Sequence, residues 1–218
     1  KGWYRPQWLW PILVVWLGAM AWLLVDNDFQ FDLPMQLGIF LPGLFLGCLF
    51  CHGELYRLRP APARLTAFYL AISAGGALGG LLVAVVAPLV LTGYYELGAG
   101  LVALGVLAAI RFAGVNRIAR YASLAALLGI AACAAYDSMR YQRDVRVATR
   151  SFYGVLRVKE YGVPGEDSHL RRLVHGAIMH GEQYLGDEKS RRMLTTYYHQ
   201  DSGIGAAIRS VGDRPARV

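Results

Sequence analysis

Residues 66–95 contain no charged side chain. An α-helix needs about 20 predominantly apolar residues to cross a bilayer, so this stretch is long enough to span the hydrocarbon core. The composition agrees, since 56% of the residues are hydrophobic and only 17% are charged. The stretch therefore predicts an integral membrane protein.

Further apolar runs on both sides of this stretch extend the prediction to a bundle. We expect an α-helical membrane domain of about five transmembrane helices within residues 1–139, near 8–25, 33–51, 65–92, 97–112 and 118–137. The first run is too long for a signal peptide and should persist in the mature protein. The last two apolar runs are short, so their flanking arginines would have to snorkel or the bilayer would have to thin locally.

The charges between the runs predict the topology. Arginine-rich connections at 57–64 and 111–120 alternate with acidic ones at 26–32 and at Glu96. By the positive-inside rule, the amino terminus is cytoplasmic and the soluble tail lies outside a bacterial inner membrane. Because topology explains much of the net charge of +7, we expect lipid and not nucleic acid as the partner of the basic segments.

From residue 140 the sequence changes to a mixed pattern that predicts a small β-rich soluble tail. Strands are expected at 145–149, 151–161, 170–174 and 177–184, with turn chemistry at 162–167 and breakers at Gly176 and Gly186. Ser202, or Asp201 before it, should cap a short helix that runs to Arg209. A strand that begins at 217–218 would need neighbours, so we expect 140–218 to be an incomplete domain that leans on a further domain or on a partner subunit.

Four glycines in the charge-free stretch form two rows of small residues. Gly75 and Gly79, and likewise Gly76 and Gly80, are four residues apart and lie on adjoining faces of a helix. Such rows let another backbone approach closely. Two interpretations are open: the rows pack against the protein's own neighbouring helices, or they dock a second chain.

Short patterns that resemble metal or cofactor sites have plainer interpretations. The Cys-x-x-Cys-His pattern at 48–52 fits covalent haem attachment, but it ends an apolar helix on the predicted cytoplasmic side, so packed cysteines are expected. His52 and Glu54 lack a third ligand, so we expect them to be polar residues of a solvated helix end. His175 and His180 should face opposite sides of a sheet, so we expect no metal shared between them. The segment 203–208 fails as a dinucleotide loop. We expect no metal site, no cofactor held within this chain and no complete catalytic constellation.

Several segments resemble bacterial fused spermidine synthase-like proteins. The membrane part carries His-Gly-Glu-Leu at 52–55, Arg-Leu-Arg-Pro at 57–60, Leu-Thr-x-Phe-Tyr-Leu at 65–70 and the glycine-rich 75–80. The tail carries similar segments at 150–157, 173–176, 180–183 and 196–203. The two halves are independent in sequence and occur in the expected order.

The resemblance implies a small β-sheet followed by a methyltransferase-like α/β domain that binds decarboxylated S-adenosylmethionine and transfers its aminopropyl group to putrescine. It places Gln183, Tyr198 and His199 in the pocket for donor and amine. The family's acidic residue after the tyrosine-histidine pair is Gln200 here. The glycine-rich loop and the catalytic aspartate would lie beyond Val218, so no catalysis is expected from this chain alone.

Two functions are therefore open. One is a membrane-anchored aminopropyl- or alkyl-transferase whose anchor and pocket entrance are seen here. The other is a non-catalytic structural or accessory subunit, which docks onto a larger membrane complex or onto copies of itself through the glycine rows and the basic loop.

Overall fold

The computed structural model describes residues 4–25, 33–176 and 178–211. Contacts divide the chain into two units. The first, called the helical unit, comprises residues 1–87 and 94–141, and the second, called the sheet unit, comprises residues 88–93 and 142–218. Each unit is described below by itself.

The helical unit is built from long apolar helices. They are α1 (Pro6–Val25), α2 (Leu33–Arg57), α3 (Leu65–Leu81), α5 (Glu96–Phe112) and α6 (Arg117–Gln142). A 3₁₀ turn, η1 (Pro62–Arg64), precedes α3, and a π-helical turn, η2 (Leu82–Val86), continues it into the short α4 (Ala87–Val90). The helices expected from the sequence are thus confirmed, although α2 runs six residues further than the expected end at 51.

Four of the helical segments in the described ranges are long and apolar enough to cross a membrane: Pro6–Val25, Leu33–Arg57, Pro62–Val90 and Arg117–Gln142. The protein is therefore a multi-pass membrane protein. The expectation of five crossings is met by length and composition in four helices only. The exception is α5, which has 17 residues and a length of about 25 Å, against a hydrocarbon core of about 30 Å.

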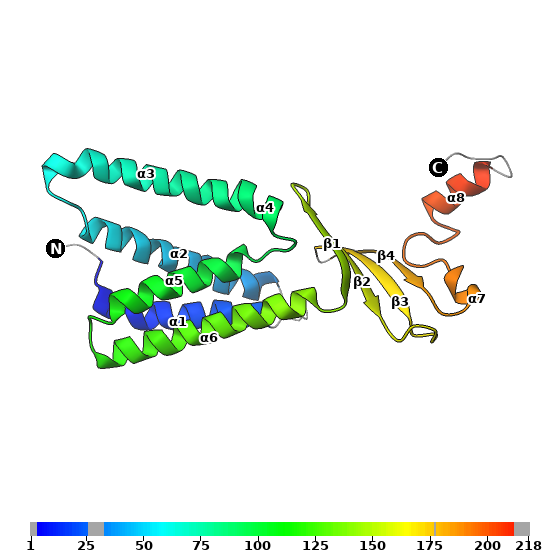
Figure 1. The fold of residues 1–218 in the computed structure, drawn as a ribbon, viewed down its shortest axis with the longest axis horizontal. Coiled ribbons are helices and arrows are strands. Elements are labelled where there is room, and N and C mark those ends of the chain that lie inside the picture. The colour runs from blue at the N-terminus through cyan, green and yellow to red at the C-terminus, as the bar shows by residue number, and fades with distance from the viewer. Residues whose placement is uncertain (1–3, 26–32, 177, 212–218) are drawn as a thin grey trace. The chain divides into compact units, whose positions relative to one another are not determined.

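The core of the helical unit forms around α1. Four of the six buried residues of α1 recur at intervals of three or four, as expected of one helical face: Leu9, Leu13, Leu17 and Met20. This face packs against α2 and α5 (Figure 1). The rings of Phe50 on α2 and Phe112 on α5 lie 5.5 Å apart. The buried stripe is apolar throughout, so this core adds packing but no chemistry.

Two glycines of α2 lie tightly against side chains of α1 and of the segment before it. A Cβ atom at Gly43 would lie 2.2 Å from Sδ of Met20, and one at Gly53 would lie 2.2 Å from the ring of Tyr4. A side chain at either position would displace the side chain of Met20 or of Tyr4. The sequence prediction had placed the packing glycines on α3, and these α2 positions were missed.

The helix α3 runs apart from the other helices of its unit (Figure 1). None of its residues is buried, and a Cβ atom at Gly75, Gly76, Gly79 or Gly80 would meet no atom within 4 Å among the described residues. The interpretation that these rows pack against the protein's own helices does not hold in this structure. Docking of a second chain remains a prediction.

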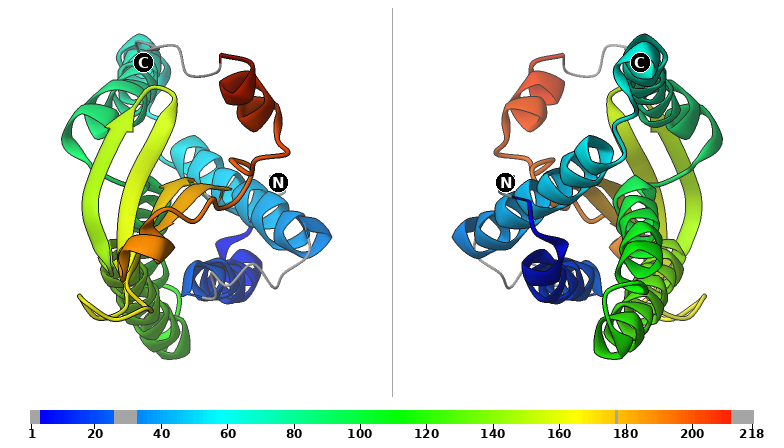
Figure 2. Two further views of the ribbon diagram at one scale, coloured as in Figure 1. Left: turned by 90° about the vertical axis from the view of Figure 1, so that its right-hand side faces the viewer. Right: turned by 90° about the vertical axis from the view of Figure 1, so that its left-hand side faces the viewer.

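The sheet unit contains a four-stranded antiparallel sheet with the strands in sequence order. They are β1 (Val145–Ser151), β2 (Gly154–Tyr161), β3 (Leu170–His175) and β4 (Ile178–Tyr184). The pairs β1–β2 and β3–β4 are hairpins (Figure 2). The expected β-rich tail is confirmed to within three residues at each strand end.

Two short helices follow the sheet. Asp187 caps α7 (Glu188–Arg191) by accepting a hydrogen bond of 2.7 Å from the backbone N–H of Ser190. Ser202 caps α8 (Gly203–Val211) in the same way, through a bond of 3.2 Å from the N–H of Gly205, as predicted. The helix α7 was not predicted, and the expected strand at 217–218 lies outside the described residues.

Candidate functional site

Four ring side chains gather beside β4 and form the candidate site of the sheet unit. We call them the aromatic cluster, defined as His175, His180, Tyr197 and Tyr198. Nδ1 of His180 is hydrogen-bonded to the hydroxyl of Tyr197 at 2.8 Å. The two histidine rings lie 5.7 Å apart and the two tyrosine rings 4.7 Å apart. Two strands and a loop thus bring four polar rings together.

The pairing of the histidine rings corrects the expectation that His175 and His180 face opposite sides of a sheet. Gly176 adopts a φ of 59° and reverses the chain between them, so His175 ends β3 while His180 lies on β4. A bulge in the same hairpin shifts the register between Leu173 and Val174. No third His, Cys, Asp or Glu completes a metal-binding group in the described part of the chain.

The loop after α7 folds back onto β4 and positions the tyrosines. The hydroxyl of Thr195 donates a hydrogen bond to the backbone carbonyl of Glu182. The ring of Tyr198 lies against Gly181, where an added Cβ would be 3.7 Å away. Tyr197 and Tyr198 keep 51% and 44% of their surface exposed. The cluster is therefore fixed to the sheet and still open to a ligand.

The phenol of Tyr197 is neutral at physiological pH. Partial burial, together with the neighbouring Tyr198 hydroxyl, raises its pKa above the ordinary value. A neutral phenol offers an electron-rich ring face and an oxygen lone pair. Both are suited to a cationic ligand.

The structure divides the three residues that the resemblance implied. Tyr198 belongs to the aromatic cluster. His199 follows it but points elsewhere, with Nδ1 3.4 Å from a carboxylate oxygen of Asp201 and 62% of its side chain exposed. Gln183 lines a separate hollow of about 470 Å³. Tyr197 was missed by the sequence reasoning, although it stands directly before the implied tyrosine-histidine pair.

The hollow at Gln183 is rich in positive charge. Arg171 and Arg191 supply this charge, and His169 also contributes to the lining. Glu160 offsets part of the charge, since its carboxylate accepts a hydrogen bond of 2.9 Å from Nε of Arg171, and it also lies 2.8 Å from Nε2 of His169. These contacts lower the pKa of Glu160 to about 2, so the carboxylate stays ionised. A hollow of this charge suits an anionic group, whereas the aromatic cluster suits a cation.

A second polar group lies at one end of the helical unit. One carboxylate oxygen of Glu54 accepts hydrogen bonds from the hydroxyl of Tyr4 at 2.6 Å and from Nε of Arg111 at 2.7 Å, and the other accepts one from Nε of Arg57 at 2.9 Å. The Glu54 side chain is only 13% exposed. The expectation that His52 and Glu54 sit at a solvated helix end is therefore wrong for Glu54, because α2 continues past it to Arg57.

This group joins the segment before α1 to α2 and α5, through hydrogen bonds between side chains of these parts of the chain. Tyr4 and Arg111 were missed because they lie 50 and 57 residues from Glu54 in the sequence. The Cys-x-x-Cys-His stretch at 48–52 lies inside α2, where Cys48 is exposed and Cys51 partly buried. We assign Glu54 and its partners a structural role in holding these parts of the chain together.

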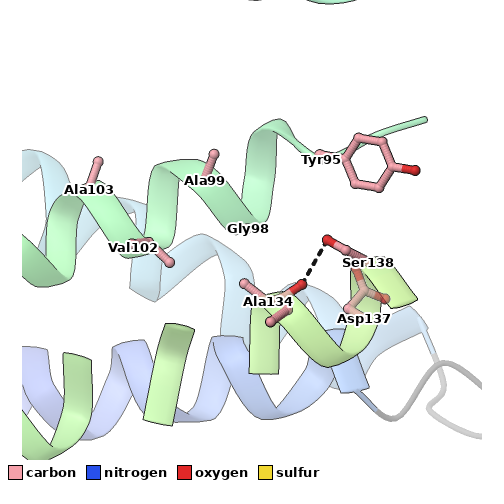
Figure 3. A pocket seen from close by; sticks show the side chains of 9 residues that line it. Tyr95, Gly98, Ala99, Val102, Ala103, Ala134, Asp137 and Ser138 are labelled. Carbon is pink, nitrogen blue, oxygen red and sulfur yellow. Dashed lines mark hydrogen bonds between the residues drawn. The ribbon is translucent and has the colours of Figure 1, made fainter. Parts of the chain in front are cut away.

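A hollow lies between α5 and α6 (Figure 3), and its volume is about 440 Å³. Small side chains make up most of its wall, with Tyr95, Asp137 and Ser138 at one end. The hydroxyl of Ser138 donates to the carbonyl of Ala134 at 2.8 Å, so it is engaged with its own helix. The hollow accommodates an apolar group and lacks the converging polar groups of a catalytic pocket.

Searches against protein-family models, curated proteins and solved structures found no match. The geometry of the aromatic cluster and of the unpartnered α3 therefore carries the functional argument. The first bears on ligand binding and the second on assembly.

Proposed function

We propose that the protein is a membrane-anchored, spermidine synthase-like transferase, in which the helical unit is the anchor and the sheet unit binds a cationic substrate. The aromatic cluster carries this proposal. Its two tyrosines are exposed, and Tyr198 is one of the residues that the resemblance assigns to substrate binding. The four-stranded sheet also occupies the place in the chain where that resemblance expects a small sheet.

The ligand chemistry follows from the rings. Decarboxylated S-adenosylmethionine carries a sulfonium and an ammonium group, and putrescine carries two ammonium groups. A cation over the face of a tyrosine ring is stabilised by about 0.5–2 kcal/mol. Tyr198 supplies such a face, while His180 holds the hydroxyl of Tyr197 in place. In this proposal these residues bind and orient the substrate. The transfer of the aminopropyl group requires residues other than these.

Calorimetry on the full chain in detergent tests the proposal. Decarboxylated S-adenosylmethionine and putrescine are titrated into the native chain and into Tyr198→Phe and Tyr198→Leu. Phenylalanine keeps the ring face, so its Kd should stay near the native value, whereas leucine should weaken binding by about 2- to 30-fold, the equivalent of that cation–ring energy. Tyr69→Leu, an exposed tyrosine of α3, is the control. Absence of saturable binding at millimolar ligand, or equal binding by the two Tyr198 variants, would refute the transferase proposal.

A second candidate function is an accessory subunit of a larger membrane complex. The observation that favours it is α3, which has no buried residue and presents Gly76 and Gly79 without neighbours among the described residues. Such a surface fits the transmembrane helix of another subunit. Gly79→Ile should then reduce the apparent mass of the complex on size exclusion of a mild detergent extract, whereas Val83→Ile, also on an exposed position, should not. Migration of the native chain as a monomer would refute this candidate.

The side of the membrane on which the sheet unit lies separates the two candidates. Five crossings put it opposite the amino terminus, and four crossings, with α5 not spanning, put it on the same side. S-adenosyl donors are made in the cytoplasm, so the transferase requires a cytoplasmic sheet. Thiol labelling of Arg59→Cys and Ser168→Cys in intact cells, with the three native cysteines replaced by alanine, decides this. Labelling of position 168 alone from outside would favour the accessory subunit.

A further inference from the structure

The turn between β1 and β2 carries two aromatic side chains in water-exposed positions. Phe152 is 93% and Tyr153 is 86% exposed, more than any other large apolar side chain that the structure describes. Their rings stack edge to face at 5.7 Å. Exposure of two adjacent aromatic rings is unfavourable in water, since each would gain free energy by burial.

The turn itself does not require aromatic residues. Gly154 takes the positive φ of 133°, and the hydroxyl of Ser151 accepts a hydrogen bond of 3.2 Å from the backbone N–H of Tyr153. Two-residue hairpin turns favour Gly, Asn and Asp for their backbone geometry, and Phe-Tyr supplies none of that preference. The aromatic pair therefore serves an interaction outside the hairpin.

The hairpin is tied to the end of a membrane span. The guanidinium group of Arg150 donates a hydrogen bond to the carbonyl of Gly93, within the sheet unit. Gly93 lies three residues after Val90, where the third candidate span ends. Three residues reach at most about 10 Å, and Phe152 lies about 7 Å beyond Arg150 along the strand. These short links keep the aromatic pair near the end of the span, and the headgroup layer begins there, about 5–8 Å thick on each side of the core.

The two ends of the sheet differ in polarity, and this difference indicates which end faces the membrane surface. The β3–β4 turn lies at the same end as the aromatic pair, because Nε2 of His175 is 3.2 Å from the carbonyl oxygen of Tyr153. That turn adds Ile178, which is 62% exposed. The opposite end is the β2–β3 turn, which carries Glu166 and Asp167. An anionic lipid surface repels an acidic end, so the apolar end is the one suited to face it.

We infer that the β1–β2 tip, Phe152 and Tyr153, is a membrane-interface anchor, with the headgroup layer of the bilayer as its partner. Tyrosine and phenylalanine are suited to this layer, which takes the apolar ring and hydrates the hydroxyl. The anchor holds the aromatic end of the sheet at the lipid surface. It is independent of both candidate functions, since it requires neither a ligand nor a partner protein.

Spin labelling of the full chain in lipid nanodiscs tests the inference. The discs contain phosphatidylcholine and phosphatidylglycerol, and the native cysteines are replaced by alanine. Nitroxides are placed singly at positions 152, 153 and, as the control, at the exposed Val163 of the β2–β3 turn. Power saturation should show labels at 152 and 153 more accessible to oxygen than to a water-soluble nickel chelate, and a label at 163 the reverse. Chelate accessibility at 152 equal to that at 163, or protection of 152 from both reagents, would overturn the anchor.

Labelling at the tip removes an aromatic ring, so a second variant leaves the tip intact. A nitroxide at Ile178, at the same end of the sheet, should be partly protected from the chelate in the native background. The double substitution Phe152→Ser and Tyr153→Ser should then raise its chelate accessibility severalfold. An unchanged accessibility at 178 would also overturn the inference.

Discussion

Removal of the Glu54 carboxylate should weaken the helical unit mainly through Arg111 and only slightly through Arg57. Both arginines donate to Glu54, at 2.7 and 2.9 Å respectively, so distance does not distinguish them. Exposure does. The side chain of Arg111 is 23% exposed and that of Arg57 49%, against 13% for Glu54. The first pair is largely removed from water, whereas the second is shared with it.

The expected coupling energies follow from this difference. A hydrogen bond to a charged and mostly buried group contributes about 1.5–3 kcal/mol. An exposed ion pair contributes about 0.2–1 kcal/mol. Double-mutant cycles should therefore give a coupling of about 2 kcal/mol for Glu54→Gln with Arg111→Gln, and about 0.5 kcal/mol for Glu54→Gln with Arg57→Gln.

Tryptophan fluorescence provides the assay. All five tryptophans lie within residues 3–22, so their emission reports on α1 and the segment before it. Denaturant titrations in detergent micelles, followed by this emission, give the free energy of unfolding of each single and double variant. Equal couplings for the two arginines would refute the argument from exposure, and so would a larger coupling for Arg57.

Two further predictions concern glycines and pH. Gly47→Leu should destabilise the helical unit by about 1–3 kcal/mol, because an added Cβ would lie 3.0 Å from Cδ2 of Leu104. Gly79→Leu meets no atom within 4 Å, so the free energy of unfolding of the isolated chain, followed by tryptophan emission, should stay unchanged or rise by up to about 1 kcal/mol. Equal losses of stability in the two variants would contradict the assignment of α2 as the packed helix. The pKa of Glu160 is lowered to about 2 by His169 and Arg171, below its unfolded value of about 4.3, so its stabilisation is present above that value and is lost as pH falls toward 2. Amide exchange in β2 should therefore differ between native and Glu160→Gln chains at neutral pH and converge on acidification, and a difference that persists unchanged with pH would contradict this contribution.

The sequence predicted the secondary structure well because each signal was local. Charge-free runs located the helices, and the turn residues Gly176 and 162–167 located the strand ends. The cap at Ser202 was also readable from a single residue type in front of a helix. By contrast, α7 spans four residues, too few for a periodic pattern to show it, although Asp187 was in place to cap it.

Contacts between distant segments could not be predicted in the same way. The bond from Arg111 to Glu54 closes a separation of 57 residues, and no pattern within either helix specifies it. The same limit applies to His175 and His180. Their spacing of five implied opposite faces of one strand, whereas the turn at Gly176 placed them on neighbouring strands with their rings 5.7 Å apart.

The two glycine sets show what decides whether small residues bring helices together. On α2, Gly43 and Gly53 face Met20 and Tyr4 at 2.2 Å from an added Cβ, so the partner's large side chains fill the space that the glycines leave. On α3, the more regular row of glycines meets no side chain in the described chain. Spacing creates a smooth surface, but only a complementary bulky surface makes it a contact. Within this chain α1 supplies that surface to α2, and nothing described supplies it to α3, which makes α3 the helix whose partner, lipid or protein, is decisive for how the protein assembles.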